Sequence, residues 1–139
     1  MKRLNLSICV ITDSVPELGR THLQVAAAAI RGGATMIQYR NKTVGDEEFD
    51  ETALMLLAMT RAAGIPLIIN DRVSIAIAVG ADGVHIGRED GDADKVRRYL
   101  PEEMCLGVSA TDYDEALAVS AIGADYLGVR PDLFHCQQD

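Results

Sequence analysis

The chain has 139 residues, of which 48% are hydrophobic and 24% charged, so it can bury one core and has an ordinary globular composition. A formal net charge of −8 leaves no basic surplus for a nucleic-acid backbone or an anionic membrane surface, so we expect neither partner. No apolar run approaches the roughly 20 residues of a membrane span, and residues 1–12 do not match a signal peptide. Three widely spaced cysteines fit neither a Cys-x-x-Cys metal site nor a disulfide framework, which predicts a cytoplasmic protein with reduced thiols.

Strand and helix patterns alternate along the whole chain. Apolar runs typical of buried strands cover residues 8–12, 34–38, 67–69, 83–86, 105–109 and 125–129. Helical spacing of apolar residues lies between them, at 23–30, 46–57, 75–79, 93–100 and 113–122. This order predicts one α/β domain with a parallel sheet. The glycine-ended units at 80–83 and 123–126 favour a β/α barrel over an open sheet, and no dinucleotide or P-loop fingerprint is present.

Polar residues follow the third and fourth predicted strands. Asn70 and Asp71 close the third, and Glu89 and Asp90 lie just past the fourth. Ligands bind at the carboxyl ends of the strands in parallel α/β proteins, so these side chains are expected at one site. Oxygen ligands that include few carboxylates suit Mg²⁺, which keeps water and is shared with substrate phosphates. For each segment alone the alternative is helix capping, by Asn70 or Asp71 and by Asp90.

The second predicted strand runs into a basic segment. Strand alternation points Gln38, Arg40 and Lys42 to one side and Tyr39 and Asn41 to the other. The first three side chains are therefore expected to face one ligand.

Five other residues have plainer interpretations. His85 is interpreted as a core or barrel-lining histidine, and His22 as a residue on a helix surface. Arg72 is expected to pair with a neighbouring acid at least as readily as to contact substrate. Cys9 and Cys105 are interpreted as small core hydrophobes.

Several segments together resemble one known family. They are VITD at 10–13, GGATMIQYRNK at 32–42, IINDR at 68–72, GADGVHIGRED at 80–90, LGVSA at 106–110 and GADYLGV at 123–129. In this order, over residues 8–129, they resemble the thiamine-phosphate synthases, a family of (β/α)₈ TIM barrels. The resemblance implies a Mg²⁺-dependent transferase that joins hydroxymethylpyrimidine diphosphate to thiazole phosphate, releasing pyrophosphate and forming thiamine phosphate.

The resemblance also implies roles for site residues. Gln38, Arg40 and Lys42 match positions that hold the pyrophosphate, where the fork of an arginine and the point charge of a lysine are useful. The remaining matches are Asn70 as a ligand-binding residue, Ser109 as a hydroxyl that assists the leaving diphosphate, and Asp71 and Asp90 as Mg²⁺ ligands. Arg40, Lys42 and Ser109 are thus the expected catalytic residues.

The last residues depart from the family pattern. The sequence predicts about six β/α units, so the barrel is expected to be incomplete, with residues 1–129 as a partial barrel and 130–139 as an aberrant tail. Permissible codons for the tail, read one nucleotide on, can encode the glycine–proline continuation of the family, which suggests a frameshift near Arg130. We expect truncation to impair the enzyme, and the open sheet edges to allow homo-oligomers.

Three other functions compete with the synthase. The related thiazole tautomerases usually lack the acid at the position of Asp90 and use a histidine where this chain has Ala110 and Thr111. A generic phosphate-binding barrel would explain the architecture but not the combination of polar residues. A non-catalytic barrel fragment is the third alternative.

Overall fold

The computed structural model describes residues 4–87 and 91–129. Within these ranges, six strands form one parallel sheet in which each strand pairs with the next along the chain. The strands are β1 (Cys9–Ile11), β2 (Met36–Tyr39), β3 (Leu67–Asn70), β4 (Gly83–Ile86), β5 (Cys105–Ala110) and β6 (Tyr126–Val129). Three predictions fall on residues outside these ranges. They are the role of Asp90 as a Mg²⁺ ligand, the frameshift near Arg130 and the aberrant tail at 130–139.

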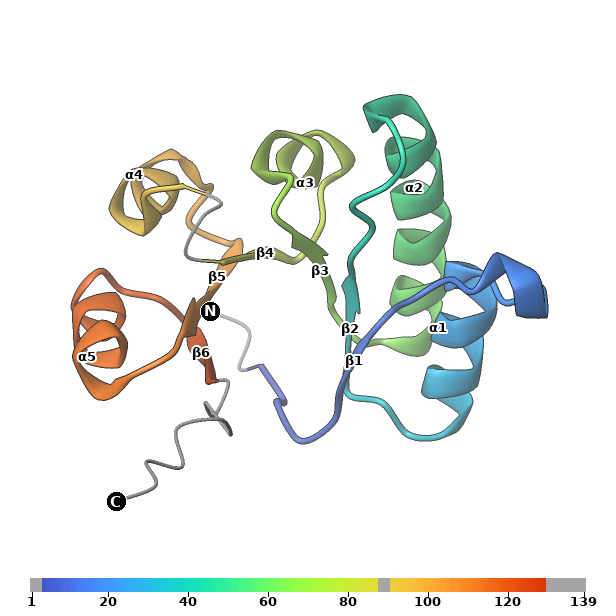
Figure 1. Cartoon of the computed structure of the whole chain (residues 1–139), viewed down its shortest axis with the longest axis horizontal. Coiled ribbons are helices and arrows are strands. Elements are labelled where there is room, and N and C mark those ends of the chain that lie inside the picture. The colour runs from blue at the N-terminus through green and yellow to red at the C-terminus, as the bar shows by residue number, and fades with distance from the viewer. Residues whose placement is uncertain (1–3, 88–90, 130–139) are drawn as a thin grey trace, which may run out of the picture.

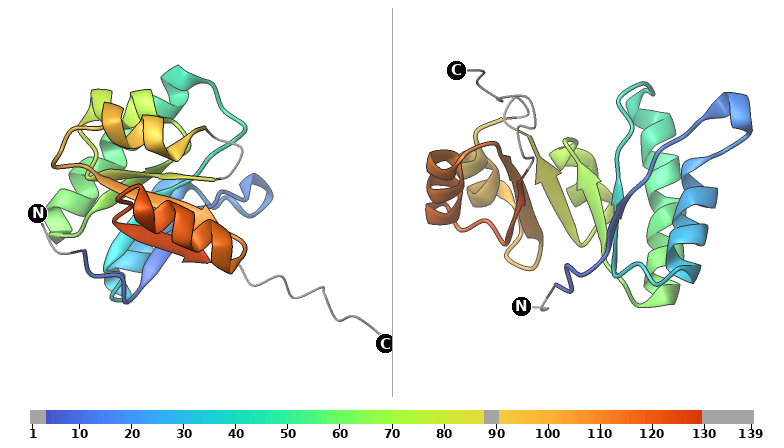
Figure 2. Two further views of the ribbon diagram at one scale, coloured as in Figure 1. Left: turned by 90° about the vertical axis from the view of Figure 1, so that its left-hand side faces the viewer. Right: turned by 60° about the horizontal axis from the view of Figure 1, so that its bottom comes forward.

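Helices cover the outer face of this sheet, which curves into part of a barrel (Figures 1 and 2). After the short 3₁₀ helix η1 (Pro16–Leu18), they are α1 (His22–Arg31), α2 (Asp46–Ala63), α3 (Val73–Val79), α4 (Ala93–Tyr99) and α5 (Tyr113–Ala121). Strict alternation of parallel strands with outer helices is the arrangement of a (β/α)₈ barrel, which confirms the predicted fold class. None of the described helices is long and apolar enough to cross a membrane.

The main core lies between the sheet and α2. Phe49, Ala53 and Leu56 on that helix are fully buried, as their spacing predicts. In β2, Ile37 and Tyr39 pack into this core, whereas Gln38 faces the opposite side of the sheet. Strand alternation therefore separates an apolar outer layer from an inner face on which the polar side chain of Gln38 lies.

The first strand is less buried than its apolar sequence predicts. Cys9 is exposed and Ile11 is 52% exposed, so the predictions of a buried strand and of a core Cys9 were wrong. The reason is its place in the sheet: β1 pairs with β2 alone among the described strands. Cys105, by contrast, is buried on β5 as expected.

The start of α1 also differs from the prediction. Thr21 and Gln24 form a capping box around its first turn. His22 follows the cap and is buried rather than exposed at the surface, because its Nδ1 lies 2.9 Å from Oγ1 of Thr12 and its ring packs edge-on against Tyr39.

The helix-capping alternatives for Asn70, Asp71 and Asp90 were wrong. Arg72 occupies the N-cap position of α3 and makes no side-chain capping hydrogen bond, so neither Asn70 nor Asp71 is the N-cap residue. The cap of α4 is Asp92, whose carboxylate accepts a hydrogen bond from the amide of Asp94.

Candidate functional site

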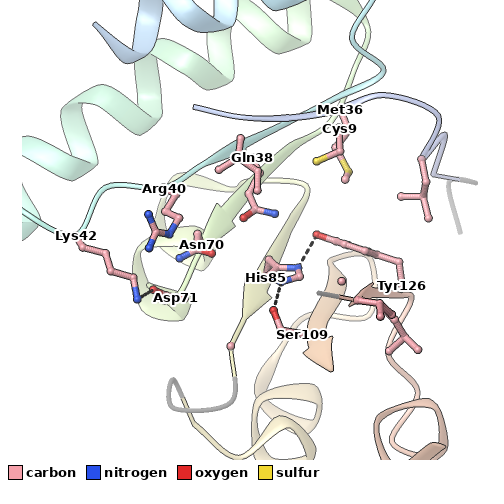
Figure 3. Close-up of a pocket in the computed structure, with 16 residues that line it drawn as sticks. Cys9, Met36, Gln38, Arg40, Lys42, Asn70, Asp71, His85, Ser109 and Tyr126 are labelled. Atoms are coloured by element: carbon pink, nitrogen blue, oxygen red, sulfur yellow. Dashed lines mark hydrogen bonds and ion pairs between the residues drawn. The ribbon is translucent and has the colours of Figure 1, made fainter. Parts of the chain in front are cut away.

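A cavity of about 610 Å³ opens on the inner face of the curved sheet (Figure 3). All six predicted site residues within the described ranges line it: Gln38, Arg40, Lys42, Asn70, Asp71 and Ser109. They come from β2, β3 and β5 or from the residues just after these strands. Parallel strands deliver them to one place because their carboxyl ends share an edge of the sheet.

An ion pair in this cavity joins the ends of β2 and β3. Nζ of Lys42 lies 3.3 Å from Oδ2 of Asp71, and the Lys42 side chain is 55% exposed. Asp71 has a φ of 67°, the one positive value among the described residues other than glycine. Such left-handed backbone costs about 1–2 kcal/mol in most L-residues, less in aspartate, and is concentrated at functional sites. The amide of Asp71 donates to the carbonyl of His85, so β4 helps to hold this conformation.

A second polar group lies deeper, between β4, β5 and β6. Nε2 of His85 lies 2.9 Å from Oγ of Ser109, and its Nδ1 lies 3.1 Å from the hydroxyl of Tyr126 (Figure 3). His85 is buried, and burial raises the pKa of the Tyr126 phenol, which therefore stays protonated at neutral pH. The lining role predicted for His85 is confirmed.

Two glycines make room for this group. A Cβ atom on Gly107 would lie 2.2 Å from Cζ of Tyr126, and one on Gly128 would lie 2.9 Å from Cε1 of His85. Gly107 and Tyr126 are register partners on adjacent strands. Sequence analysis missed Tyr126, because its partner His85 is 41 residues away and only the strand register brings the two together.

Arg72 faces away from this group. Its guanidinium pairs with Asp46 at 2.6 Å, as predicted, and it is absent from the cavity lining.

The metal site remains a prediction. Asp71 is the one acidic residue lining the cavity within the described ranges, and Asp90, its expected co-ligand, lies outside them. Across residues 4–87 and 91–129, no group of three or more His, Cys, Asp or Glu side chains is placed to hold an ion. The oxygen donors of Asp71 and Asn70 suit Mg²⁺ chemically.

Comparison with known proteins identifies the family. The family model described as thiamine monophosphate synthase matches residues 8–133. The chain belongs to this family. It is 50% identical over 122 residues to the thiamine-phosphate synthase of Chloroflexus aurantiacus, covering 88% of this chain and 56% of that protein. It is 45% identical over 128 residues to that of Clostridium tetani, covering 92% and 61%.

Solved structures agree with the family assignment. The thiamine phosphate pyrophosphorylase of Pyrococcus furiosus superposes with a TM-score of 0.85 at 35% identity, covering 93% of this chain and 62% of that one. The dihydropteroate synthase of Burkholderia cenocepacia, at 18% identity and a TM-score of 0.56, shares the fold. The chain matches 56% and 61% of the lengths of the Chloroflexus and Clostridium proteins and 62% of the Pyrococcus protein, so it spans less than two thirds of each of these relatives.

Proposed function

We propose that this chain binds hydroxymethylpyrimidine diphosphate in the cavity and acts in the formation of thiamine phosphate from it and thiazole phosphate. The observation that carries the proposal is the convergence of Arg40 and Lys42, from the end of one strand, on the cavity that also contains Ser109. Family membership supports the same reaction.

The two cations suit a pyrophosphate group. The guanidinium of Arg40 can donate two parallel hydrogen bonds to phosphate oxygens, and Lys42 adds a mobile point charge. Gln38, which is buried on the cavity side of β2, adds a neutral amide donor. These residues would bind the diphosphate end of the substrate and leave the pyrimidine deeper in the cavity.

In the reaction, a carbon–oxygen bond of the pyrimidine substrate breaks and its electron pair leaves with pyrophosphate. The thiazole nitrogen then supplies the electron pair for the new carbon–nitrogen bond. Negative charge therefore grows on the departing oxygens, where Arg40 and Lys42 stabilise it. No nucleophilic side chain is required, so positioning and charge stabilisation are the tasks of the protein.

The hydroxyl of Ser109 assists the leaving group in this account. If the phenol of Tyr126 donates to Nδ1 of His85, then Nε2–H of the neutral imidazole donates to Oγ of Ser109. The serine proton is then free to donate to a pyrophosphate oxygen. Both distances are within hydrogen-bond range, so the geometry is compatible with this tautomer of His85, and the proposal adopts it.

We also propose that Mg²⁺ is bound by Asp71, with Asp90 as the expected second carboxylate. When bound, the ion would neutralise charge on the pyrophosphate, as is usual for Mg²⁺ shared with substrate phosphates. The cytoplasmic location expected from the cysteine content is part of the same proposal.

Association through the sheet edges is a further part of the proposal. The outer sides of β1 and β6 have no strand partner within the described ranges. Open edges of this kind pair readily with other chains. Light scattering on the purified chain tests it: a monomer at all concentrations would contradict association.

The reaction is tested by supplying both phosphorylated substrates with Mg²⁺ to the purified chain and measuring thiamine phosphate by chromatography. Product formation that Arg40→Met abolishes supports the proposal. Absence of product would contradict synthase activity for this chain. Isomerisation of a thiazole substrate with no need for the diphosphate would favour the tautomerase instead.

A further inference from the structure

Arg72 connects the two strand ends that carry the charged residues of the cavity. Its backbone directly follows Asp71, and the turn is closed by a hydrogen bond from its amide to the carbonyl of Asn70. Its side chain, 21% exposed, extends to the segment between β2 and α2. That segment, residues 40–45, contains both Arg40 and Lys42.

The guanidinium contacts this segment on both sides of Lys42. Nη2 donates to the carbonyl of Val44 at 2.6 Å and to that of Asn41 at 3.4 Å. Nη1 donates to Asp46 at the first position of α2, at 2.6 Å. These contacts hold the backbone before and after Lys42 from a single planar group.

The position of the guanidinium is itself fixed by the core. Its central carbon lies 4.3 Å from the centroid of the Phe49 ring, which is fully buried and stacks on Tyr39 at 4.2 Å. Stacking on an aromatic face together with several donors in one plane is a property of arginine that lysine lacks. The segment is therefore attached to a rigid part of the molecule.

We propose that Arg72 is a positioning residue, which sets the placement of Lys42 toward Asp71 and toward the pyrophosphate and touches neither substrate nor product. The inference rests on the proposed function for its consequence in pyrophosphate binding. The ion pair with Asp46 contributes little to this role, because that carboxylate is 87% exposed and water screens it. The backbone carbonyls of Asn41 and Val44 are the contacts that matter.

Arg97 offers a matched control in the same chain. Its side chain is also 21% exposed and it too pairs with an aspartate, Asp125, at 3.4 Å. It donates to the carbonyls of Pro101 and Met104. It does not line the cavity, so its loss removes a similar set of contacts without touching the segment that carries Lys42.

The experiment compares Arg72→Met, Arg72→Lys and Arg97→Met with the wild-type chain. Calorimetry measures the affinity for Mg²⁺-pyrophosphate, urea unfolding measures stability, and hydrogen exchange follows the amide of Thr43, which donates to Oδ1 of Asn41. We expect Arg72→Met to weaken pyrophosphate binding at least about tenfold and to speed exchange at Thr43. Arg72→Lys should recover only part of the affinity, and Arg97→Met should keep the wild-type affinity even if it is less stable.

Two results would overturn the proposal. One is wild-type affinity and wild-type exchange at Thr43 in Arg72→Met, and the other is an equal loss of affinity in Arg97→Met. If Arg72→Met does not fold, Arg72→Lys decides by the same two readouts. Failure of the proposed function looks different, because the wild-type chain itself would then not bind pyrophosphate.

Discussion

Nε2 of His85 lies 2.9 Å from Oγ of Ser109, and this contact joins β4 to β5 inside the cavity. It orients the one serine that lines the cavity in the described part of the chain. The proposed role of Ser109 as a donor to pyrophosphate depends on this orientation.

Replacing Ser109 with alanine should therefore reduce activity more than stability. A hydrogen bond to a charged group is worth about 1.5–3 kcal/mol, so turnover to thiamine phosphate should fall by roughly 10–100-fold. The control is Ser120→Ala, which removes a serine hydroxyl that donates to the carbonyl of Ala116 on α5, away from the cavity. Equal turnover in the two variants would show that Ser109 has no part in the reaction.

Replacing Arg40 with lysine keeps the charge and removes the fork. We expect the affinity for pyrophosphate to fall by about tenfold, because one of two parallel charge-assisted hydrogen bonds is lost. Calorimetric titration measures it. Arg98→Lys is the control, because Arg98 pairs with Asp94 on the surface of α4. Unchanged affinity in Arg40→Lys would give Arg40 a structural role instead.

Gly107 should tolerate no side chain. Alanine there would place its Cβ 2.2 Å from Cζ of Tyr126, and we expect a loss of about 1–3 kcal/mol in the free energy of unfolding. Gly45 is the control, since a Cβ there meets nothing within 4 Å and its φ is −70°. Urea denaturation measures both variants. Because Gly45 is the N-cap of α2, where alanine is less favourable than glycine, a small loss is expected there as well. A stability of Gly107→Ala equal to that of the wild-type chain would mean that Tyr126 moves aside without cost.

The sequence predicted the fold well because local patterns determine much of it. The stripe at Phe49 and Leu56 and the alternation around Gln38 follow from the periods of helix and strand. The exposure of Cys9 was not predictable in this way, because an apolar run does not tell whether a strand has one neighbour or two. The burial of His22 depends on Thr12, ten residues earlier in the chain and just after β1.

The same limit applies to the candidate site. The polar ends of β2 and β3 are visible in the sequence because Lys42 and Asp71 interrupt apolar patterns. The group formed by His85, Ser109 and Tyr126 is not visible in the sequence, because it depends on the register of three strands. It also depends on the space left by Gly107, where any side chain would meet the ring of Tyr126.

Buried His22 should make stability depend on pH. Burial lowers the pKa of this histidine, and the nearby carboxylate of Asp13 opposes the shift only in part. The unfolded chain, with a histidine pKa of about 6.5, takes up a proton that the folded chain resists. The contribution of neutral His22 to the free energy of unfolding is therefore fully present above about pH 6.5. It is lost as the pH falls through the lower pKa that His22 has in the folded chain.

Urea unfolding between pH 7.5 and 5 measures this effect. The wild-type chain should lose more stability over that range than His22→Gln, which cannot take up a proton. Parallel pH profiles for the two chains would mean that His22 is protonated as readily in the folded state as in the unfolded state.

The most direct test of the proposed pyrophosphate site is to titrate hydroxymethylpyrimidine diphosphate and its monophosphate into the wild-type chain with Mg²⁺. Binding through Arg40 and Lys42 predicts that the diphosphate binds at least about tenfold more tightly, and that Arg40→Met and Lys42→Met remove most of this difference. Equal affinity for the two compounds, or an unchanged preference in both variants, would contradict the assignment of this cavity to pyrophosphate.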